Sequence, residues 1–248
     1  MKPCALIALG LSCAAQAAPP THVEVSHGIE HLSNGSPDWR ATVVTVRHDL
    51  QPVARSASLA LALTRTERFG LSDNAAAVTL VKPVSPDTVV TADASRSGTH
   101  RILAKSSLGT AMQHEFAKSW LVHGGLRTTR YNELRVNQAL LMLEHYTGPF
   151  SWAAGTRQAR AFGTTATSAE LRAAYYYGER HSVGIIVAAG REAANIGGVV
   201  TLTSSRSAAL VGRHWVRHNL ALTYSLSHAR EGEYYNRNGV NLGLQAVF

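Results

Sequence analysis

The chain has 248 residues, of which 45% are hydrophobic and 16% charged, with a formal net charge of +8. This length allows one large domain or two small ones and needs no disulfide to stabilise a core. A mean hydropathy of −0.05 excludes a polytopic helical membrane protein. The two cysteines, Cys4 and Cys13, lie at the N-terminus, so a disulfide framework and a cysteine-ligated metal site are excluded for the rest of the chain.

The N-terminus is organised like a secretory signal peptide. A short apolar core runs from Ala5 to Leu11 and is too short to span a bilayer as a helix. Ala15 and Ala17 then form the small-x-small pattern that signal peptidase recognises. We therefore expect residues 1–17 to be removed and residues 18–248 to be an exported domain without cysteine.

The exported part shows apolar and polar residues in alternation, broken by polar or Gly/Pro-containing turns, which is typical of β-strands. The clearest examples are residues 57–64, 220–226 and 240–248. The pattern predicts about fourteen strands, at residues 22–32, 39–49, 55–65, 75–83, 87–96, 104–115, 119–130, 134–146, 149–160, 168–178, 182–193, 203–213, 216–228 and 236–248. Twelve strands are the alternative if the segments near 75–96 or 199–215 are misassigned.

Strands of this length favour an all-β fold made of one antiparallel transmembrane barrel. About 10 residues, tilted by about 40°, cross an apolar band of roughly 25 Å. The connections are expected to alternate between short turns and longer loops, an asymmetry typical of outer-membrane barrels, whose short turns are periplasmic. The longer set is residues 33–38, 67–74, 98–103, 162–167, 192–201 and 229–237.

A soluble β-sandwich is the alternative, because its strands alternate as well. The terminal residue, Phe248, lies on an alternating apolar strand. Such an aromatic C-terminus resembles the signal by which the barrel-assembly machinery recognises its clients. We therefore predict the barrel and expect Phe248 to serve as this signal.

Short motifs follow one another over most of the exported part. They are Arg68-Phe69-Gly70, the stretch 120–127 with Gly124-Gly125, the turn 146–150, the run 175–179, and 233–237 followed by 239–248. In this order they resemble the YaiO family of outer-membrane β-barrels. The resemblance implies a barrel fold and an outer-membrane location, with a hint of surface polysaccharide export, and it implies no chemistry.

Charged residues on the polar face of the strands are the candidate site. We expect them to line the lumen, where a net basic interior would favour anionic solutes. The alternative is a buried network of ion pairs that plugs the barrel, although about fourteen strands are wide enough for a solvent-filled lumen. The candidates are Asp93, Glu115, Glu170, Arg127, Arg157, Arg172 and Arg217.

Catalytic and metal sites are not indicated. His27 and His31 would chelate zinc at this spacing on a helix, but on a strand they stand about 13 Å apart. His123 with Ser107 or Glu115 would be a catalytic pair only if the fold brought them together, and no catalytic signature surrounds them. We therefore expect no enzyme, no cofactor and no metal.

The distribution of arginine over nearly every strand and loop argues against nucleic-acid binding, which concentrates basic residues on one face. Outer-membrane lipid and lipopolysaccharide, whose phosphates pair with arginine, are the expected partners instead. Aromatic residues near strand ends are expected to form interfacial girdles. They are Trp39, Trp120, Trp152, Tyr131, Tyr146, Tyr234 and Tyr235.

The sequence thus predicts a passive channel or export conduit with a basic lumen, for a saccharide or anionic solute. A plugged accessory barrel that acts through its loops is the second hypothesis. A membrane-embedded hydrolase is the third.

Overall fold

The computed structural model describes residues 19–52, 56–196 and 199–248, so Ala15 and Ala17 of the expected signal peptide lie outside the described part. Within it, no helix is long and apolar enough to cross a membrane. The fourteen strands are β1 Thr21–Leu32, β2 Trp39–Asp49, β3 Ser58–Arg68, β4 Leu71–Ser85, β5 Thr88–Ser97, β6 Ser106–Ala117, β7 Trp120–Arg130, β8 Arg135–Thr147, β9 Phe150–Ala161, β10 Thr164–Tyr177, β11 His181–Ile196, β12 Val199–Arg217, β13 Leu220–Glu231 and β14 Tyr235–Val247.

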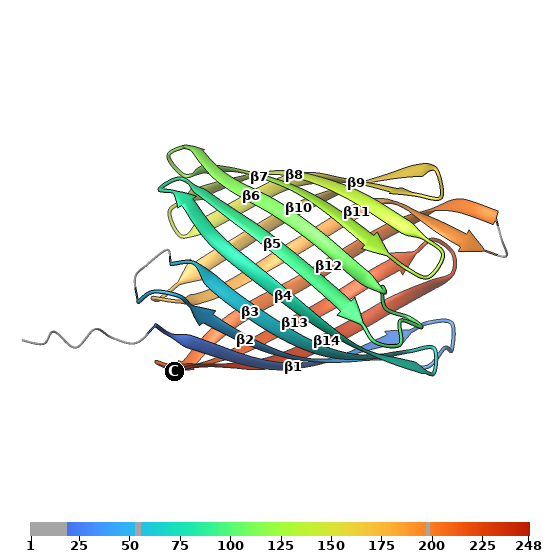
Figure 1. Cartoon of the computed structure of the whole chain (residues 1–248), viewed down its shortest axis with the longest axis horizontal. Helices are drawn as coiled ribbons and strands as arrows, with labels where there is room; N and C mark the ends of the chain where they lie inside the picture. The colour runs from blue at the N-terminus through green and yellow to red at the C-terminus, as the bar shows by residue number, and fades with distance from the viewer. Residues whose placement is uncertain (1–18, 53–55, 197–198) are drawn as a thin grey trace, which may run out of the picture.

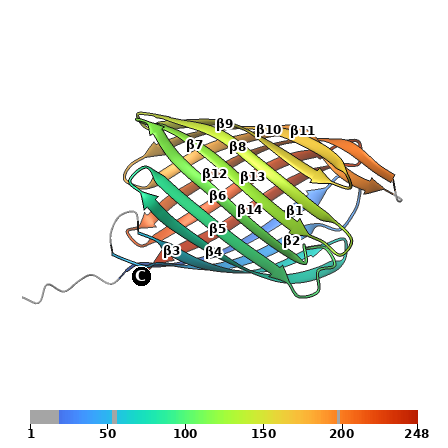
Figure 2. The same cartoon turned by 45° about the horizontal axis from the view of Figure 1, so that its top comes forward.

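The strands form one closed antiparallel barrel (Figure 1, Figure 2). Each strand pairs with its neighbours in sequence, and β1 closes the barrel on β14, with His22 opposite Val247. Phe248 lies at this seam, where its N–H donates to the carbonyl of Thr21 (2.9 Å) and its carbonyl accepts from the N–H of Thr21 (3.0 Å). The predicted barrel and its fourteen strands are confirmed. The role of Phe248 in assembly stays a prediction.

Both ends of the chain lie at one end of the barrel, which we call the terminal end, and the opposite end is the loop end (Figure 1). Two of the expected longer loops at the loop end are two-residue hairpins. They are Phe69-Gly70, with φ of 53° and 74°, and Phe162-Gly163, with φ of 51° and 75°. Two successive positive φ values are typical of the type I′ turn, which matches the twist of the flanking strands.

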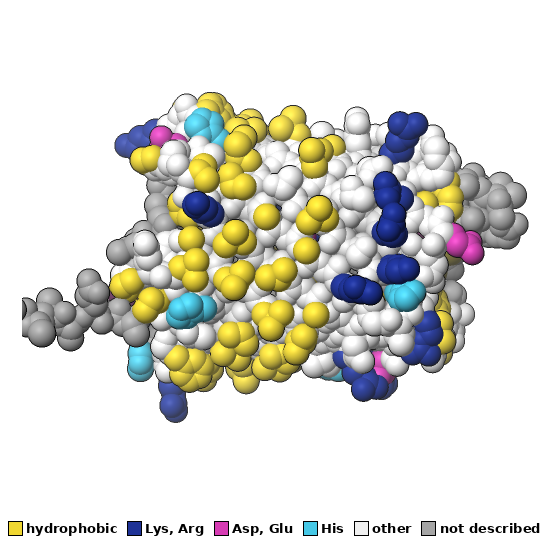
Figure 3. All heavy atoms as spheres, in the orientation of Figure 1, with side chains coloured by type: hydrophobic (Ala, Val, Ile, Leu, Met, Phe, Trp, Pro, Cys, Tyr) yellow, Lys and Arg dark blue, Asp and Glu magenta, His cyan; other side chains and the backbone are white. Residues whose placement is uncertain are grey.

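The alternation of side chains divides the wall into two faces. On β3, Leu59, Leu61 and Leu63 point outward, and Leu63 is 55% exposed. Ala60 and Ala62 between them point into the barrel. The outward apolar side chains form a band that starts near the terminal end (Figure 3), as expected for a lipid-facing surface.

The girdle prediction is partly wrong. Trp120 stacks on His145 (ring centroids 4.1 Å apart) and meets Trp152 edge-on at 5.4 Å, on the outer face near the terminal end. Trp39, in contrast, points inward and is 6% exposed, with Arg68 4.5 Å from its ring centroid. Tyr146 also points inward, because it pairs with the inward-facing Ser151. Successive residues of a strand point to opposite faces, so a position one residue along the strand changes whether a side chain faces the lipid or the lumen.

Candidate functional site

An ion pair spans the inner wall across β6, near the middle of the barrel. Asp93 on β5 lies opposite Gly109, and Gly109 lies opposite Arg127 on β7. Arg127 Nη2 donates to Asp93 Oδ1 at 2.8 Å, and its Nη1 donates to Ser107 Oγ at 3.3 Å. A Cβ on Gly109 would lie 2.6 Å from Asp93 Oδ1 and 3.0 Å from Arg127 Nη2. The absence of a side chain at Gly109 is therefore what lets this pair form over the strand between its partners.

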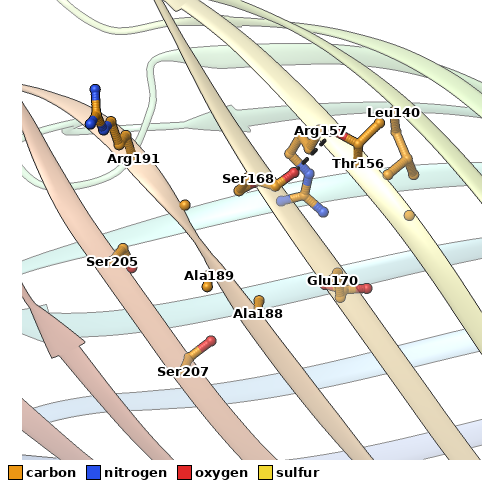
Figure 4. A pocket seen from close by; sticks show the side chains of 12 residues that line it. Leu140, Thr156, Arg157, Ser168, Glu170, Ala188, Ala189, Arg191, Ser205 and Ser207 are labelled. Atoms are coloured by element: carbon orange, nitrogen blue, oxygen red, sulfur yellow. Dashed lines mark hydrogen bonds between the residues drawn. The ribbon is translucent and has the colours of Figure 1, made fainter.

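A second group of charges adjoins this pair on β9 and β10. Arg172 Nε donates to Glu170 Oε1 at 2.5 Å. Arg157 and Glu170 line one hollow of about 210 Å³ in the wall, together with Leu140 and Ser168 (Figure 4). Arg157 also lines a hollow of about 230 Å³ that Asp93 and Arg127 share. Arg157 lines both hollows, and Arg172 is linked to Glu170 by its ion pair. We call the surface formed by Asp93, Arg127, Arg157, Glu170 and Arg172 the lumen patch.

The lumen patch carries one more positive than negative charge. Its ion pairs join Asp93 to Arg127 and Glu170 to Arg172. In the described part of the chain, Arg157 forms no ion pair. Arg157 is therefore the charge of the patch that no opposite charge offsets.

Two arginines of the lumen patch remain accessible although they point inward. The Arg127 side chain is 41% exposed and that of Arg172 is 46% exposed. A barrel plugged by its own side chains would bury inward-pointing groups at mid-height. Their exposure indicates free space in the lumen beside the patch.

The inner wall outside the lumen patch carries small neutral side chains, both on β3 and β4 beside the patch and on β13 and β14 across the lumen from it. On β3 and β4, Ala62 lies opposite Ala77 and the inward position Thr64 lies opposite Ala75. On β13 and β14, Ser225 lies opposite Asn241 and Ser227 opposite Gly239. The middle of the lumen is therefore charged on one side and short and neutral on the other.

Two of the seven predicted lumen residues lie away from the lumen patch. Glu115 is inward but near the terminal end, where Oε1 accepts from the backbone N–H of Ser119 at 3.0 Å. Arg217 ends β12 opposite Leu220, at the β12–β13 turn. Leu220 lies six residues before the outward-facing Leu226, an even spacing that puts both side chains on the outer face. The pairing with Leu220 therefore places Arg217 outside the lumen. The other five predicted residues make up the patch.

The expected net basic interior is wrong for the lumen as a whole. Sequence reasoning missed several inward carboxylates and arginines. Their positions between outward apolar residues on the same strands could have identified them. Among the described residues, the register places nine carboxylates and seven arginines inside, so the basic excess of the chain lies outside the lumen. The missed carboxylates are Glu24, Glu30, Asp49, Asp73, Glu144 and Glu231, and the missed arginines are Arg47, Arg68, Arg213 and Arg237.

Asp73 fixes a loop at the loop end. Its side chain is 0% exposed and accepts backbone N–H bonds from Ile102 (2.7 Å) and Leu103 (2.9 Å). The hydroxyl of Thr99 also donates to it, and Arg101 Nε lies 3.6 Å away. The β5–β6 connection is therefore held against the wall.

The candidate catalytic pairs are not assembled. His123 Nε2 lies 2.9 Å from Glu144 Oε2 rather than beside either expected partner. Ser107 instead hydrogen-bonds Ser95 at 2.8 Å, and Glu115 accepts from Ser119. The wall therefore shows none of the predicted nucleophile–base contacts.

His27 and His31 of β1 lie on the outer face and have separate partners. His27 Nδ1 hydrogen-bonds Thr42 Oγ1 at 2.8 Å, and His31 Nδ1 lies 3.0 Å from Asp38 Oδ1. Among the described residues, no group of three or more His, Cys, Asp or Glu could hold a metal ion.

A family model described as the YaiO membrane beta barrel domain matches residues 20–195. The chain belongs to the YaiO family. No curated protein matches it. The YaiO domain places this protein in the outer membrane, so the terminal end faces the periplasm and the loop end faces outward.

Solved structures with the same fold are outer-membrane proteins and channels at very low identity. The YaiO chain superposes on Omp33 of Acinetobacter baumannii with a TM-score of 0.59 and 9% identity, covering 92% of this chain and 99% of that one. The CymD monoaromatic hydrocarbon channel gives 0.60 at 9% identity, covering 93% and 88%. The KdgM porin gives 0.51 at 10% identity, covering 91% and 99%. Likeness at this identity shows the barrel fold alone.

Proposed function

We propose that this YaiO protein is a passive diffusion channel for small hydrophilic solutes. The observation that carries the proposal is the exposure of Arg127 and Arg172, which point inward at mid-height and still keep 41% and 46% of their side-chain surface accessible. Water can occupy that space, and a solute can cross it. No cofactor and no covalent step is involved.

The lumen patch acts on a solute through its field. Arginines and carboxylates on one side, opposite short neutral side chains, orient polar solutes and ions as they pass. Within the patch, as the structure describes it, Arg157 is the one charge without an ion pair, and it gives the patch a modest local preference for anions. Hydroxyl-rich solutes such as saccharides can hydrogen-bond with both the arginines and the carboxylates of the patch. Their direction of flow follows the concentration gradient.

The test is conductance of the refolded protein in planar bilayers, with a salt gradient to measure ion preference, and swelling of liposomes in neutral oligosaccharides. We expect stable single-channel steps, modest anion preference and size-dependent swelling. A correctly folded, heat-modifiable barrel that neither conducts nor admits sugars would contradict the proposal and favour an accessory barrel.

A matched pair of variants separates conduction through the lumen from leakage around the protein. Ala77 points inward and Ala76, its neighbour on β4, points outward. Ala77→Trp places an indole in the middle of the lumen and should lower the conductance. Ala76→Trp places the same group on the lipid side and should leave the conductance unchanged.

A further inference from the structure

Outward-pointing arginines form a belt around the barrel toward the loop end. Figure 3 shows Lys and Arg side chains gathered there, beyond the apolar band. On β5 to β8 they follow one ladder: Arg96 lies opposite Ser106, Ser106 opposite Arg130, and Arg130 opposite Arg135. On β12 and β13, Arg206 lies opposite Arg230. These five arginines, with Arg160 on β9, are named the outer belt.

The outer belt lies where the lipid-facing surface ends. Arg130 comes four residues after Leu126 on β7, an even spacing that puts both side chains on the outer face. On β8, Leu141 and Arg135 are likewise an even number of residues apart and share the outer face. Leu126 and Leu141 are among the most exposed leucines of the barrel. A lipid whose chains lie along these leucines has its headgroup at the level of the belt.

The belt brings like charges together, and Glu233, which lines the same hollow as Arg206 and Arg230, forms no ion pair with either in the described part of the chain. Arg130 and Arg135 are directly opposite, as are Arg206 and Arg230. Like charges in directly opposite positions destabilise a sheet. In the described residues none of the six belt arginines forms an ion pair, whereas the nearby Arg65 is paired with Glu67 at 3.0 Å.

We propose that the outer belt binds the phosphate groups of a bisphosphorylated glycolipid, the lipid A portion of lipopolysaccharide. Planar guanidinium groups bind phosphate oxygens in a bidentate manner. The ladder from Arg96 to Arg135 spreads its guanidiniums over β5 to β8, so two phosphates of one headgroup can bind separate arginines. The phosphates relieve the repulsion across each arginine pair, while the acyl chains pack on the apolar band. The proposal does not depend on conduction, so a barrel that binds the glycolipid without conducting supports it still.

The experiment uses native mass spectrometry and thermal unfolding of the refolded full-length mature barrel in detergent. The probes are hexa-acylated bisphosphoryl lipid A, its monophosphoryl form and phosphatidylglycerol. The test variant is Arg130→Gln with Arg135→Gln. The control removes two basic residues at the other end of the barrel, Lys82→Gln with Lys118→Gln.

We expect the wild type and the control to retain bisphosphoryl lipid A and to unfold at a higher temperature with it. In the test variant, retention should fall about tenfold, whereas its unfolding temperature without lipid should equal or exceed that of the wild type. This opposite behaviour distinguishes lost binding from a damaged fold. Equal retention of phosphatidylglycerol, equal loss in the control, or unchanged retention in the test variant would each overturn the proposal.

Discussion

Two substitutions in the lumen patch should change ion preference in opposite directions. Asp93→Asn removes the carboxylate that pairs with Arg127 at 2.8 Å and leaves that arginine unpaired. Arg157→Gln removes the arginine that has no ion pair in the described part of the patch. The net charge of the patch therefore rises by one unit in the first variant and falls by one unit in the second. Asn has the size of Asp, so the first replacement leaves the width of the lumen unchanged. Gln is polar but shorter than Arg, so the second widens the lumen slightly.

Coulomb's law gives the size of the effect. One charge acting on an ion at about 8 Å in water is worth about 0.5 kcal/mol, which screening at 0.1 M salt reduces to about 0.2 kcal/mol. This energy raises the local concentration of one ion and lowers that of the other by a factor of about 1.5 each. Each variant should thus change the anion-to-cation permeability ratio about twofold, and the two variants should differ about fourfold.

The assay is the reversal potential of single channels in a tenfold gradient of potassium chloride. Asp93→Asn should move it toward the anion equilibrium potential and Arg157→Gln away from it, and the difference should shrink as the salt concentration rises because of screening. Shifts of the same sign in the two variants, or no shift in either, would refute the assignment of these residues to the conduction path.

Three further substitutions test the packing around the site. Asp73→Ala should lower the free energy of unfolding by about 2–4 kcal/mol, because two backbone N–H donors lose a buried acceptor. Urea-induced unfolding in vesicles measures this free energy. A loss no larger than that of Asp87→Ala, in an exposed turn, would contradict the role of Asp73. Gly109→Ala should force apart the ion pair that crosses β6, since the added Cβ would lie 2.6 Å from a carboxylate oxygen. It should shift the reversal potential far less than Asp93→Asn does, because the net charge of the patch is unchanged, and an equal shift would contradict the role of net charge. Trp39→Ala should cost about 3–5 kcal/mol if the buried indole packs as a core residue, and a loss below 1 kcal/mol in the same unfolding assay would show that its packing is dispensable.

Strand number and closure could be predicted from the sequence because each strand alternates strongly inside the membrane. Apolar side chains occupy every second position on β3, at Leu59, Leu61 and Leu63, and on β13, at Leu220, Leu222, Tyr224 and Leu226. Strand ends beyond the apolar band could not be predicted as well. β4 begins at Leu71 and β11 continues to Ile196, through segments that were expected to be loops. At the start of β4 the outward positions Ser72 and Asn74 are polar, so hydrophobic alternation disappears there while backbone pairing continues.

The face of each charged residue was harder to predict than the strand that carries it. Asp93 and Arg127 were predicted inward and lie inward, because apolar neighbours mark the opposite face of their strands. Near strand ends such markers are missing, and Arg217, which follows an irregularity between Trp215 and Arg217, lies away from the lumen. The pairing of Arg130 with Arg135 depends on register between strands, which a single sequence does not specify.

The central claim, a water-filled lumen beside the patch, is tested most directly by cysteine accessibility. Residues 18–248 contain no cysteine, so introduced thiols are the only ones to react. Ala62 points inward at mid-height, and its neighbour Leu63 points outward in the apolar band. With the barrel in liposomes, a charged, membrane-impermeant thiosulfonate reagent should modify Ala62→Cys rapidly and leave Leu63→Cys almost unmodified. Protection of the thiol at position 62 equal to that at position 63 would contradict an open lumen.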